Sequence, residues 1–259
     1  MRKNPDWNVL ISSYTAVKEE LPLDRRADLW VCGYIPEGDL LSTLLTTPGG
    51  RVLDYGCGNG RVSRYLSRRY GYQVTGVDVN PEAILRAQSF ADGLRYQLIE
   101  PDRIPKSLTP FDACVCNHVF PTFSCLNQIR ETLLAIRDTL ADGAPLLVYV
   151  DNTNYWGIEY HSFIGGRPGE VYESGDPFPM KIYSAKRIIM EFEDFFWKPE
   201  DYIQVISSAG FSDVTVKYPE PEAQAIAAYE QYFGVPLQTS LATEKQFPPA
   251  AIYCSVKAR

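Results

Sequence analysis

The sequence predicts an α/β fold: a Rossmann-like parallel sheet with helices on both faces. Strand and helix signals alternate from residue 51 to residue 150. The strands predicted at 111–117 and 145–150 are nearly continuous apolar runs, as expected for strands buried on both faces. A glycine-rich turn separates the first strand of this series from the first helix. These three observations together indicate the fold class.

The alternating series begins with a strand at 51–55 and a helix at 59–70. A second strand at 73–79 is followed by Asn80 and Pro81, a typical N-cap and first-turn pair that opens a helix through Phe90. After the strand 111–117, apolar residues recur every three or four positions and predict a helix that ends at Gly143. Those residues are Leu126, Ile129, Leu133, Ile136 and Leu140. The strand 145–150 follows.

Residues 152–184 interrupt this alternation. Glycines and prolines are interleaved with aromatic residues, which predicts an inserted cap or lid without regular strands or helices. Regular structure is expected again at 185–195, in a helix at 199–209, and in strands at 214–218 and 251–256, the last of them antiparallel. With no internal repeat and no second core evident, we expect residues 1–259 to form a single domain, with residues 1–47 as an N-terminal cover.

Composition excludes several classes of function. The net charge is −7, and the basic pairs at 25–26 and 68–69 are too short for a phosphate-binding track, so no nucleic acid partner is expected. No apolar run approaches the roughly 20 residues of a membrane span, and the N-terminus leads into no apolar signal core. Six cysteines lack zinc-site spacing, so we expect no metal site, reduced thiols and a cytoplasmic protein. The oligomeric state is not predicted.

The glycine-rich turn carries the strongest functional signal. It reads Asp-Tyr-Gly-Cys-Gly-Asn-Gly at 54–60. Glycines allow a sharp turn and the close approach of a ligand, and the helix that follows offers free N–H groups and a positive dipole end. Asp78 ends the next strand, at the sheet edge where ligands bind in open α/β folds. An acid there can accept both ribose hydroxyls, so we predict a nucleotide-like cofactor.

Two common cofactor motifs fit poorly. A dinucleotide fingerprint requires a third glycine at position 61, which is Arg61, and no P-loop Gly-Lys-Ser/Thr follows. The remaining pattern, Asp-x-Gly-x-Gly-x-Gly, resembles the class I S-adenosylmethionine-dependent methyltransferase family. The resemblance covers residues 48–150 and, by pattern only, 185–257. It implies S-adenosyl-L-methionine as the cofactor and methyl transfer as the activity.

The resemblance also implies roles for individual residues. The loop that begins at Asp54 and contains Gly56, Cys57, Gly58 and Gly60 would wrap the methionine part of the cofactor. Asp78 would take the ribose hydroxyls, Val79 would flank the adenine, and Glu100 would reach the adenine amino group. Pro101 stands where the family usually offers a backbone N–H and has none, so Asp102 is expected to replace part of that contact. Asn117, at the end of the fourth strand, would complete the cofactor site.

The methyl group should emerge beside residues 117–120. DNA amino-methylating relatives carry two prolines there, where this chain has His118 and Val119. No acid occurs between Asp112 and Glu131, so the paired-glutamate loop of protein arginine methyltransferases is missing too. We therefore expect a small metabolite that offers an oxygen, nitrogen or carbon nucleophile. His118 and His161, the two histidines of the chain, are the candidate general bases.

The aromatic insertion is the expected acceptor site. Tyr155, Trp156 and Tyr160 would stack on a planar acceptor or surround a cation, or would form a satellite core under the loop. In the N-terminal cover, Tyr14 is a candidate for the methionine carboxylate. Two other hypotheses stay open at this stage: a cofactor-binding relative without methyl transfer, and a nicotinamide-dependent oxidoreductase, although no Tyr-x-x-x-Lys pair follows the fourth strand.

Overall fold

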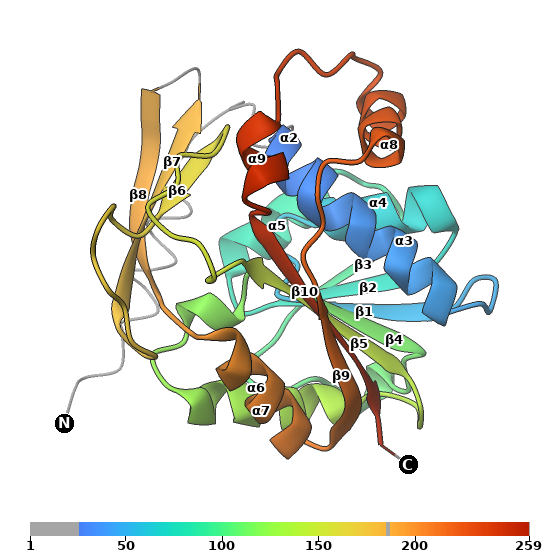
Figure 1. Cartoon of the computed structure of the whole chain (residues 1–259). Coiled ribbons are helices and arrows are strands. Elements are labelled where there is room, and N and C mark those ends of the chain that lie inside the picture. Colours follow the sequence, from blue (N-terminus) through green and yellow to red (C-terminus); the bar gives the residue numbers. More distant parts are fainter. Residues whose placement is uncertain (1–25, 185–186, 259) are drawn as a thin grey trace.

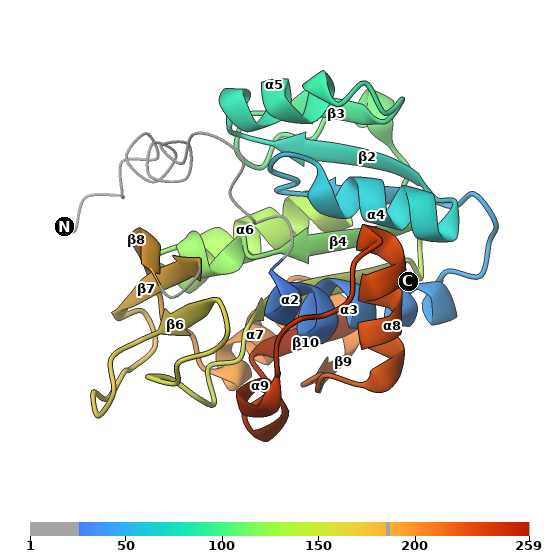
Figure 2. The same cartoon turned by 90° about the horizontal axis from the view of Figure 1, so that it is seen from above.

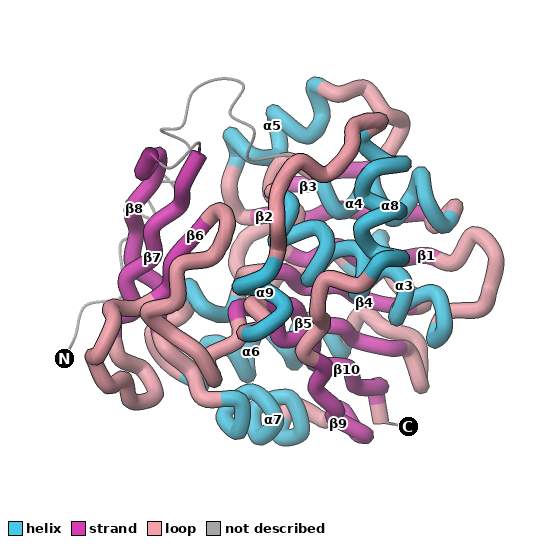
Figure 3. Tube along the Cα trace, turned by 45° about the horizontal axis from the view of Figure 1, so that its top comes forward, coloured by secondary structure: helices cyan, strands magenta, loops and turns pink. Residues whose placement is uncertain are grey.

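The computed structural model describes residues 26–184 and 187–258, and its centre is a seven-stranded sheet. The strands are β1 (Arg51–Tyr55), β2 (Gln73–Asp78), β3 (Arg95–Leu98), β4 (Ala113–Asn117), β5 (Pro145–Asp151), β9 (Phe211–Lys217) and β10 (Ala250–Lys257). Their order is β3-β2-β1-β4-β5-β10-β9. In this order the first five are parallel, and β10 runs antiparallel to both neighbours. Figure 3 shows the strands in magenta with the helices around them. The predicted Rossmann-like fold with an antiparallel last strand is confirmed.

Helices cover both faces of this sheet (Figure 1). One face carries α3 (Ile35–Leu44), α4 (Arg61–Tyr70) and α8 (Ala223–Phe233), and the other carries α6 (Leu126–Arg137) and α7 (Pro199–Ser208). Within β1, Val52 packs on the α3–α4 side and Leu53 on the α6–α7 side, as strand alternation requires. Helix α5 (Pro81–Ser89) packs against β2 and β3. Strand β3 and helix α8 are not predicted by the sequence patterns above.

Of two helix boundaries predicted from the sequence, the structure confirms one and contradicts the other. The side-chain oxygen of Asn80 accepts hydrogen bonds from the N–H groups of Glu82 and Ala83, at 2.9 and 3.2 Å, so the predicted N-cap is confirmed. The helix predicted after the strand at 111–117 was expected to end at Gly143. This prediction is wrong, because that helix, α6, ends at Arg137. The backbone of residues 139–141 instead pairs with Phe111, whose N–H donates to Thr139 and whose carbonyl accepts from Ala141. The strand predicted from 111 accordingly begins at Ala113.

The insertion contains regular strands, which corrects the expectation of an irregular loop. Strands β6 (Phe163–Gly165), β7 (Pro177–Ser184) and β8 (Arg187–Phe195) form a separate antiparallel sheet. Pro179 is tolerated within β7 because its carbonyl accepts from Gly166, on the side away from β8. The position of its missing N–H lies on that same side, so the pairing with β8 loses no donor there. A second core also exists, formed by Tyr160, Phe163, Tyr172, Phe178, Met180, Ile182 and Phe196. Alternation in β7 turns its apolar side chains to this core.

The three-stranded sheet lies at one end of the molecule, away from α8 (Figure 2). It is tied to the segment that follows β4, because β8 contacts the short helix η4 (Phe120–Thr122) and the indole N–H of Trp197 donates to the Phe123 carbonyl. On its other side, Ser162 donates to the carboxylate of Asp28, which lies in α2 (Ala27–Leu29). The insertion therefore stands over the carboxyl ends of β4 and β5.

The N-terminal segment is described from residue 26, so Tyr14 and most of the predicted cover lie outside the described residues. From Ala27 a short helix, α2, continues through the π-helical turn η2 (Trp30–Tyr34) into α3. Trp30 is fully buried, with edge-on ring contacts to Tyr34 and Tyr65. Near the other terminus, α9 (Ala242–Gln246) precedes β10. Among the described helices, none is long and apolar enough to cross a membrane.

Candidate active site

The glycine loop after β1 forms a closed turn against β2. The N–H groups of Gly56 and Cys57 both donate to the Val77 carbonyl, at 2.8 and 3.0 Å, and Gly60 N–H donates to the Cys57 carbonyl. At Gly56, with φ +74°, a Cβ would lie 2.2 Å from the Val119 side chain. At Gly58, with φ +53°, a Cβ would meet nothing within 4 Å. Gly56 thus fits the turn against the segment after β4, whereas Gly58 borders open space.

The Asp78 carboxylate binds the backbone on both sides of this loop's end. Its two carboxylate oxygens each accept one backbone N–H, from Gly58 and from Asn80, both at 2.8 Å. Each oxygen keeps a lone pair for a further donor. Burial raises the pKa of Asp78, and the two backbone donors oppose that shift. A carboxylate in this position is a structural clamp of the loop and keeps lone pairs that could accept from a ligand.

Asp54, by contrast, lies inside the protein. It is 1% exposed and accepts a hydrogen bond of 2.5 Å from the Ser63 hydroxyl in α4. Burial is the main cause that raises its pKa to about 6, and the nearby Asp78 carboxylate adds to the shift. Asp54 therefore supports the first turn of α4, and its contact with the methionine part of the cofactor stays a prediction.

The other residues predicted around the cofactor lie in different surroundings. Val79 is half-buried and packs on the main core. The Cys57 thiol is buried among residues of α5 and β3, so its side chain lies away from the open side of the loop. Glu100 and Pro101 are exposed, and Glu100 forms an ion pair with Arg103 at 2.9 Å. Asp102, with φ +57°, accepts hydrogen bonds from Tyr55 and Thr132.

At the end of β4, Asn117 contacts a buried acid that the sequence analysis did not single out. The Asn117 side-chain amide donates to one carboxyl oxygen of Glu37, in α3, at 2.8 Å. Glu37 is 0% exposed, and burial raises its pKa well above the ordinary value. The other carboxyl oxygen of Glu37 and the carbonyl oxygen of Asn117 are buried with no hydrogen-bond partner in the described chain. The pair offers two unused acceptors.

His118 follows directly and takes a left-handed backbone conformation, with φ +54°. Its backbone N–H donates to the Tyr149 carbonyl, and its ring atom Nδ1 lies 4.0 Å from Oδ1 of Asp151. Burial lowers the pKa of His118 to about 3, assisted by the positive charges of Arg26 and Arg61. Its Nε2 is buried and has no partner among the described residues. The imidazole is therefore uncharged at neutral pH and weakly basic.

Asp151 ends β5, directly before the insertion. Burial raises the pKa of Asp151 to about 6, although Arg26 opposes the shift. Asp194, in β8, is 6% exposed, and burial together with the Asp151 charge raises its pKa well above the ordinary value. Burial and the same Asp151 charge raise the pKa of the Tyr160 hydroxyl. The charge of Asp151 thus acts on Asp194 and Tyr160, which are distant from each other in the sequence.

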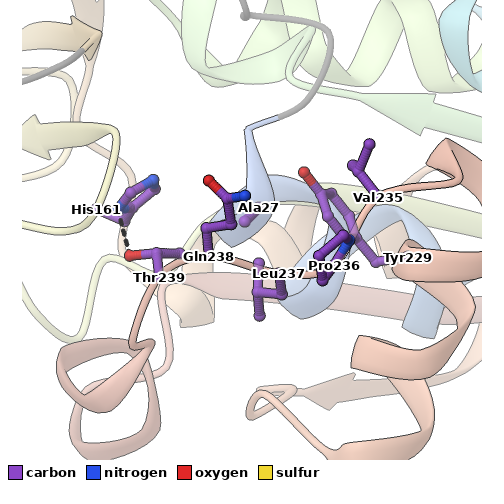
Figure 4. Close-up of a pocket in the computed structure, with 8 residues that line it drawn as sticks. All are labelled: Ala27, His161, Tyr229, Val235, Pro236, Leu237, Gln238 and Thr239. Carbon is purple, nitrogen blue, oxygen red and sulfur yellow. Dashed lines mark hydrogen bonds between the residues drawn. The ribbon is translucent and has the colours of Figure 1, made fainter.

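The remaining predicted residues lie elsewhere. Tyr155 is 39% exposed, with its ring against Phe247, and the Trp156 indole donates to the Glu170 carbonyl inside the insertion. His161 lines a separate pocket of about 340 Å³ (Figure 4). There its Nδ1 lies 2.9 Å from the Thr239 hydroxyl. The other lining residues are Ala27, Tyr229, Val235, Pro236, Leu237 and Gln238.

The structure buries Tyr160 in the core of the insertion, whereas His161 lines a separate pocket whose lining does not include His118. Residues 160–162 alternate, so that Tyr160 and Ser162 are buried while His161 is exposed. The sequence analysis missed Asp151, although an acid directly after a predicted parallel strand is a usable signal. Glu37 and Asp194 carry no such local signal. No group of three or more His, Cys, Asp or Glu suited to a metal ion occurs in the part of the chain that the structure describes.

Comparisons with known proteins agree with this arrangement. Residues 34–168 match the model of a family described as "Methyltransferase domain". An N-demethylindolmycin N-methyltransferase from Streptomyces griseus is 31% identical over 179 residues, which cover 66% of this chain and 74% of that protein. A ribosomal RNA small subunit methyltransferase C from Pseudomonas aeruginosa is 30% identical over 192 residues, which cover 71% of this chain and 57% of that protein.

The fold is similar to that of solved methyltransferases. An amino pentose methyltransferase from Micromonospora echinaspora, solved with S-adenosylmethionine bound, superposes with a TM-score of 0.53 at 14% identity. The superposition covers 100% of both chains. At this identity the likeness concerns the arrangement of the elements alone.

Proposed function

This chain belongs to the class I S-adenosylmethionine-dependent methyltransferase family, and we propose that its acceptor binds between β4, β5 and the insertion. The acceptor is a small metabolite with an oxygen, nitrogen or carbon nucleophile. One observation carries the proposal: the Asp78–Gly58 clamp and the His118–Asp151 pair stand at the carboxyl ends of neighbouring parallel strands. Ligands of open α/β sheets bind at that edge.

The residues present fit S-adenosylmethionine. The space beside Gly58 admits a ligand close to the backbone, and both Asp78 oxygens retain lone pairs for ribose hydroxyls. The unpartnered oxygens of Glu37 and Asn117 suit an ammonium group. Asp54 would support the loop through Ser63. Val79 remains the candidate beside the adenine, and Glu100 would first have to release Arg103.

When bound, the cofactor supplies an electrophilic methyl group. The protein then has to align the acceptor nucleophile and exclude water, and such orientation supplies roughly 7–11 kcal/mol of a reaction barrier. His118, whose backbone N–H donates to the Tyr149 carbonyl, would orient the nucleophile through Nε2. The insertion would cover the nucleophile. The low pKa of His118 favours a positioning role over that of a general base. Tyr160 is the residue of the aromatic insertion that we place in contact with the acceptor.

We propose a small molecule over a nucleic acid because the acceptor edge carries two acids, Asp151 and Asp194, and the whole chain has a net charge of −7. Bound RNA requires cations that neutralise its phosphates. We further propose one domain in which residues 152–184 form the lid, joined by β8 of the same three-stranded sheet. The six free cysteines favour the cytoplasm, where thiols stay reduced.

A labelled-methyl experiment tests the proposed function. The protein is incubated with S-adenosylmethionine labelled in the methyl group and, in parallel, with a small-metabolite extract or with ribosomal RNA. Label in a small molecule supports the proposal, and label in RNA alone contradicts it. Asp78→Asn serves as the cofactor-site control. Calorimetry with S-adenosylmethionine and NADH separates a protein that binds the cofactor without methyl transfer from one of another cofactor class.

A further inference from the structure

Glu37 and Asn117 form a buried polar contact in which both partners keep an unused acceptor. The Asn117 side-chain amide donates to Oε2 of Glu37 at 2.8 Å, although the two residues are 80 positions apart. Oε1 of Glu37 and Oδ1 of Asn117 are also buried, and neither has a hydrogen-bond partner in the described part of the chain. Buried oxygens of this kind normally have a donor, so the pair indicates a ligand that donates hydrogen bonds.

Close packing of α3 and η2 on the sheet holds Glu37 at this place. Glu37 lies in the first turn of α3 and is 0% exposed. One turn earlier, at Gly33, a Cβ would lie 2.3 Å from the ring of Tyr149, so a residue without a side chain permits this approach of helix to sheet. Tyr149 stands opposite Asn117 in the pairing of β5 with β4. The fold therefore positions the Glu37 carboxyl group at the end of β4.

The strand register places the pair beside the glycine loop. Tyr55 stands opposite Cys116 in the parallel pairing of β1 with β4. The residues that follow them, Gly56 and Asn117, therefore begin adjacent loops. A Cβ at Gly56 would lie 2.2 Å from the Val119 side chain, which shows how closely these two loops approach each other. The unused oxygens thus lie at the end of β4 that adjoins the glycine loop.

Two strand spacings separate this pair from Asp78. Asp78 ends β2, the glycine loop follows β1, and Asn117 ends β4, in the strand order β2-β1-β4. Neighbouring strands lie about 4.8 Å apart, so the ends of β2 and β4 are about 10 Å apart. In S-adenosylmethionine, the chain of atoms from the ribose through sulfur to the amino group can cover that span. A cofactor whose ribose binds Asp78 can therefore bring its amino group to the end of β4.

The electrostatic surroundings of Glu37 favour a cationic ligand. Burial raises the pKa of Glu37 well above its ordinary value, the Asn117 amide opposes this shift, and the Asp54 carboxylate adds to it. Among residues 26–184 and 187–258, no cation forms an ion pair with Glu37. An ammonium ion beside the carboxyl group would stabilise its charged form.

We propose that Glu37, together with the side-chain oxygen of Asn117, binds the α-ammonium group of S-adenosylmethionine. This inference rests on the proposed function and adds a residue of α3 to its cofactor site. An ammonium group donates in several directions and can satisfy both unused oxygens at once, whereas a hydroxyl group has one proton to donate. The contact fixes the methionine end of the cofactor and with it the direction of the bond between sulfur and the methyl group.

Two ligands that differ only in the amino group test the inference. S-adenosylhomocysteine carries the ammonium group, and S-adenosyl-4-thiobutyrate is the same molecule with hydrogen in its place. Calorimetry measures the affinity of the full chain for each ligand. We expect the wild type to bind S-adenosylhomocysteine at least about tenfold more tightly, because that ligand alone makes the charged hydrogen bonds.

Variants assign this difference to the pair. Glu37→Gln keeps the shape of the side chain and removes its charge, so it should weaken S-adenosylhomocysteine binding at least about tenfold and leave S-adenosyl-4-thiobutyrate binding unchanged. Asn117→Ala should show the same selectivity. Glu131→Gln is the matched control, because Asn127 donates to Glu131 at the same 2.8 Å on the exposed side of α6. This control should leave both affinities unchanged, and melting temperatures show that each variant folds.

Several results would overturn the inference. Equal weakening of both ligands in Glu37→Gln would mean that the carboxyl group has its partner within the chain, and unchanged affinity for both would place the ammonium group elsewhere. If Glu37→Gln does not fold, equal affinities of the two ligands in the wild type, or an unselective loss in Asn117→Ala, overturn the inference instead. If S-adenosylhomocysteine does not bind the wild type at all, the proposed function fails. The two failures are therefore distinguishable.

Discussion

His118 and Asp151 meet across neighbouring strands, with Nδ1 of the imidazole 4.0 Å from Oδ1 of the carboxylate. His118 adopts φ +54°, a backbone conformation that costs a residue with a side chain about 1–3 kcal/mol when it is held by its surroundings. The hydrogen bond from its N–H to the Tyr149 carbonyl fixes that conformation at the end of β4. Strain at the end of a parallel strand is consistent with a functional position.

The first prediction concerns the pH dependence of turnover. Because His118 has a pKa near 3, it should add no limb to the profile of kcat/KM near pH 6.5, the ordinary value for histidine. Activity should instead rise as the pH passes about 6, where Asp151 loses its proton. Steady-state rates of the wild type and Asp151→Asn measure this. A limb that persists unchanged in Asp151→Asn would assign it to another group.

His118 itself can be tested by replacement with asparagine, which tolerates a left-handed backbone. His118→Asn should slow turnover at least about tenfold while the affinity for S-adenosylmethionine stays nearly constant, since a positioning group is lost. Single-turnover rates and calorimetry separate the two quantities. Full activity of the variant would remove His118 from the acceptor site.

The glycine loop offers a matched pair of variants. Gly58→Ala should lower the stability by about 1–2 kcal/mol, from its positive φ alone, because its methyl group would meet no protein atom. The same methyl group would occupy the open space that we assign to the cofactor, so the variant should no longer bind it. Gly56→Ala should destabilise the protein more, since its Cβ would lie 2.2 Å from Val119. Urea unfolding and calorimetry on both variants give the comparison. Normal cofactor affinity in Gly58→Ala would place the ligand elsewhere.

Asp78→Asn should weaken S-adenosylmethionine binding by more than about 1 kcal/mol. The amide keeps the shape of the side chain but replaces one acceptor oxygen with a donor, so a ribose hydroxyl loses its partner. Calorimetry measures the affinity, and thermal unfolding shows whether the loop stays closed. Asp138→Asn, at an exposed position beyond α6, is the control. Equal affinities in the wild type and Asp78→Asn would exclude the clamp from the cofactor site.

The last prediction is a gain of stability in Asp151→Asn. The folded protein raises the pKa of Asp151 from 3.8 to about 6, so between these values the unfolded chain loses the proton first. The free energy of unfolding of the wild type therefore falls as the pH rises through 6. The variant, which cannot ionise, should be more stable by about 1–3 kcal/mol above that pH and equal to the wild type near pH 4. Urea unfolding of the wild type and the variant at both pH values measures this difference in stability.

Local patterns in the sequence determined the sheet class, the glycine loop and the family of the cofactor. Each depends on residues close in the chain: the loop at 54–60, the acid Asp78 at a strand end, and the apolar periodicity of α6. Such local signals predict the folded structure correctly because backbone conformation and strand ends depend on residues only a few positions apart. The two errors at 139–141 and in the insertion arose where backbone groups found partners outside their own segment.

Only the tertiary structure shows where the residues of the acceptor site that we propose lie. Asp151, Tyr160 and Asp194 come from β5, the insertion and β8, and Glu37 reaches Asn117 from a helix eighty positions earlier. None of these pairs leaves a periodic trace in the sequence, because their contacts depend on how separate layers pack. Burial then sets their chemistry: the same dense packing that removes water from these carboxyl groups and from His118 shifts their pKa values in opposite directions.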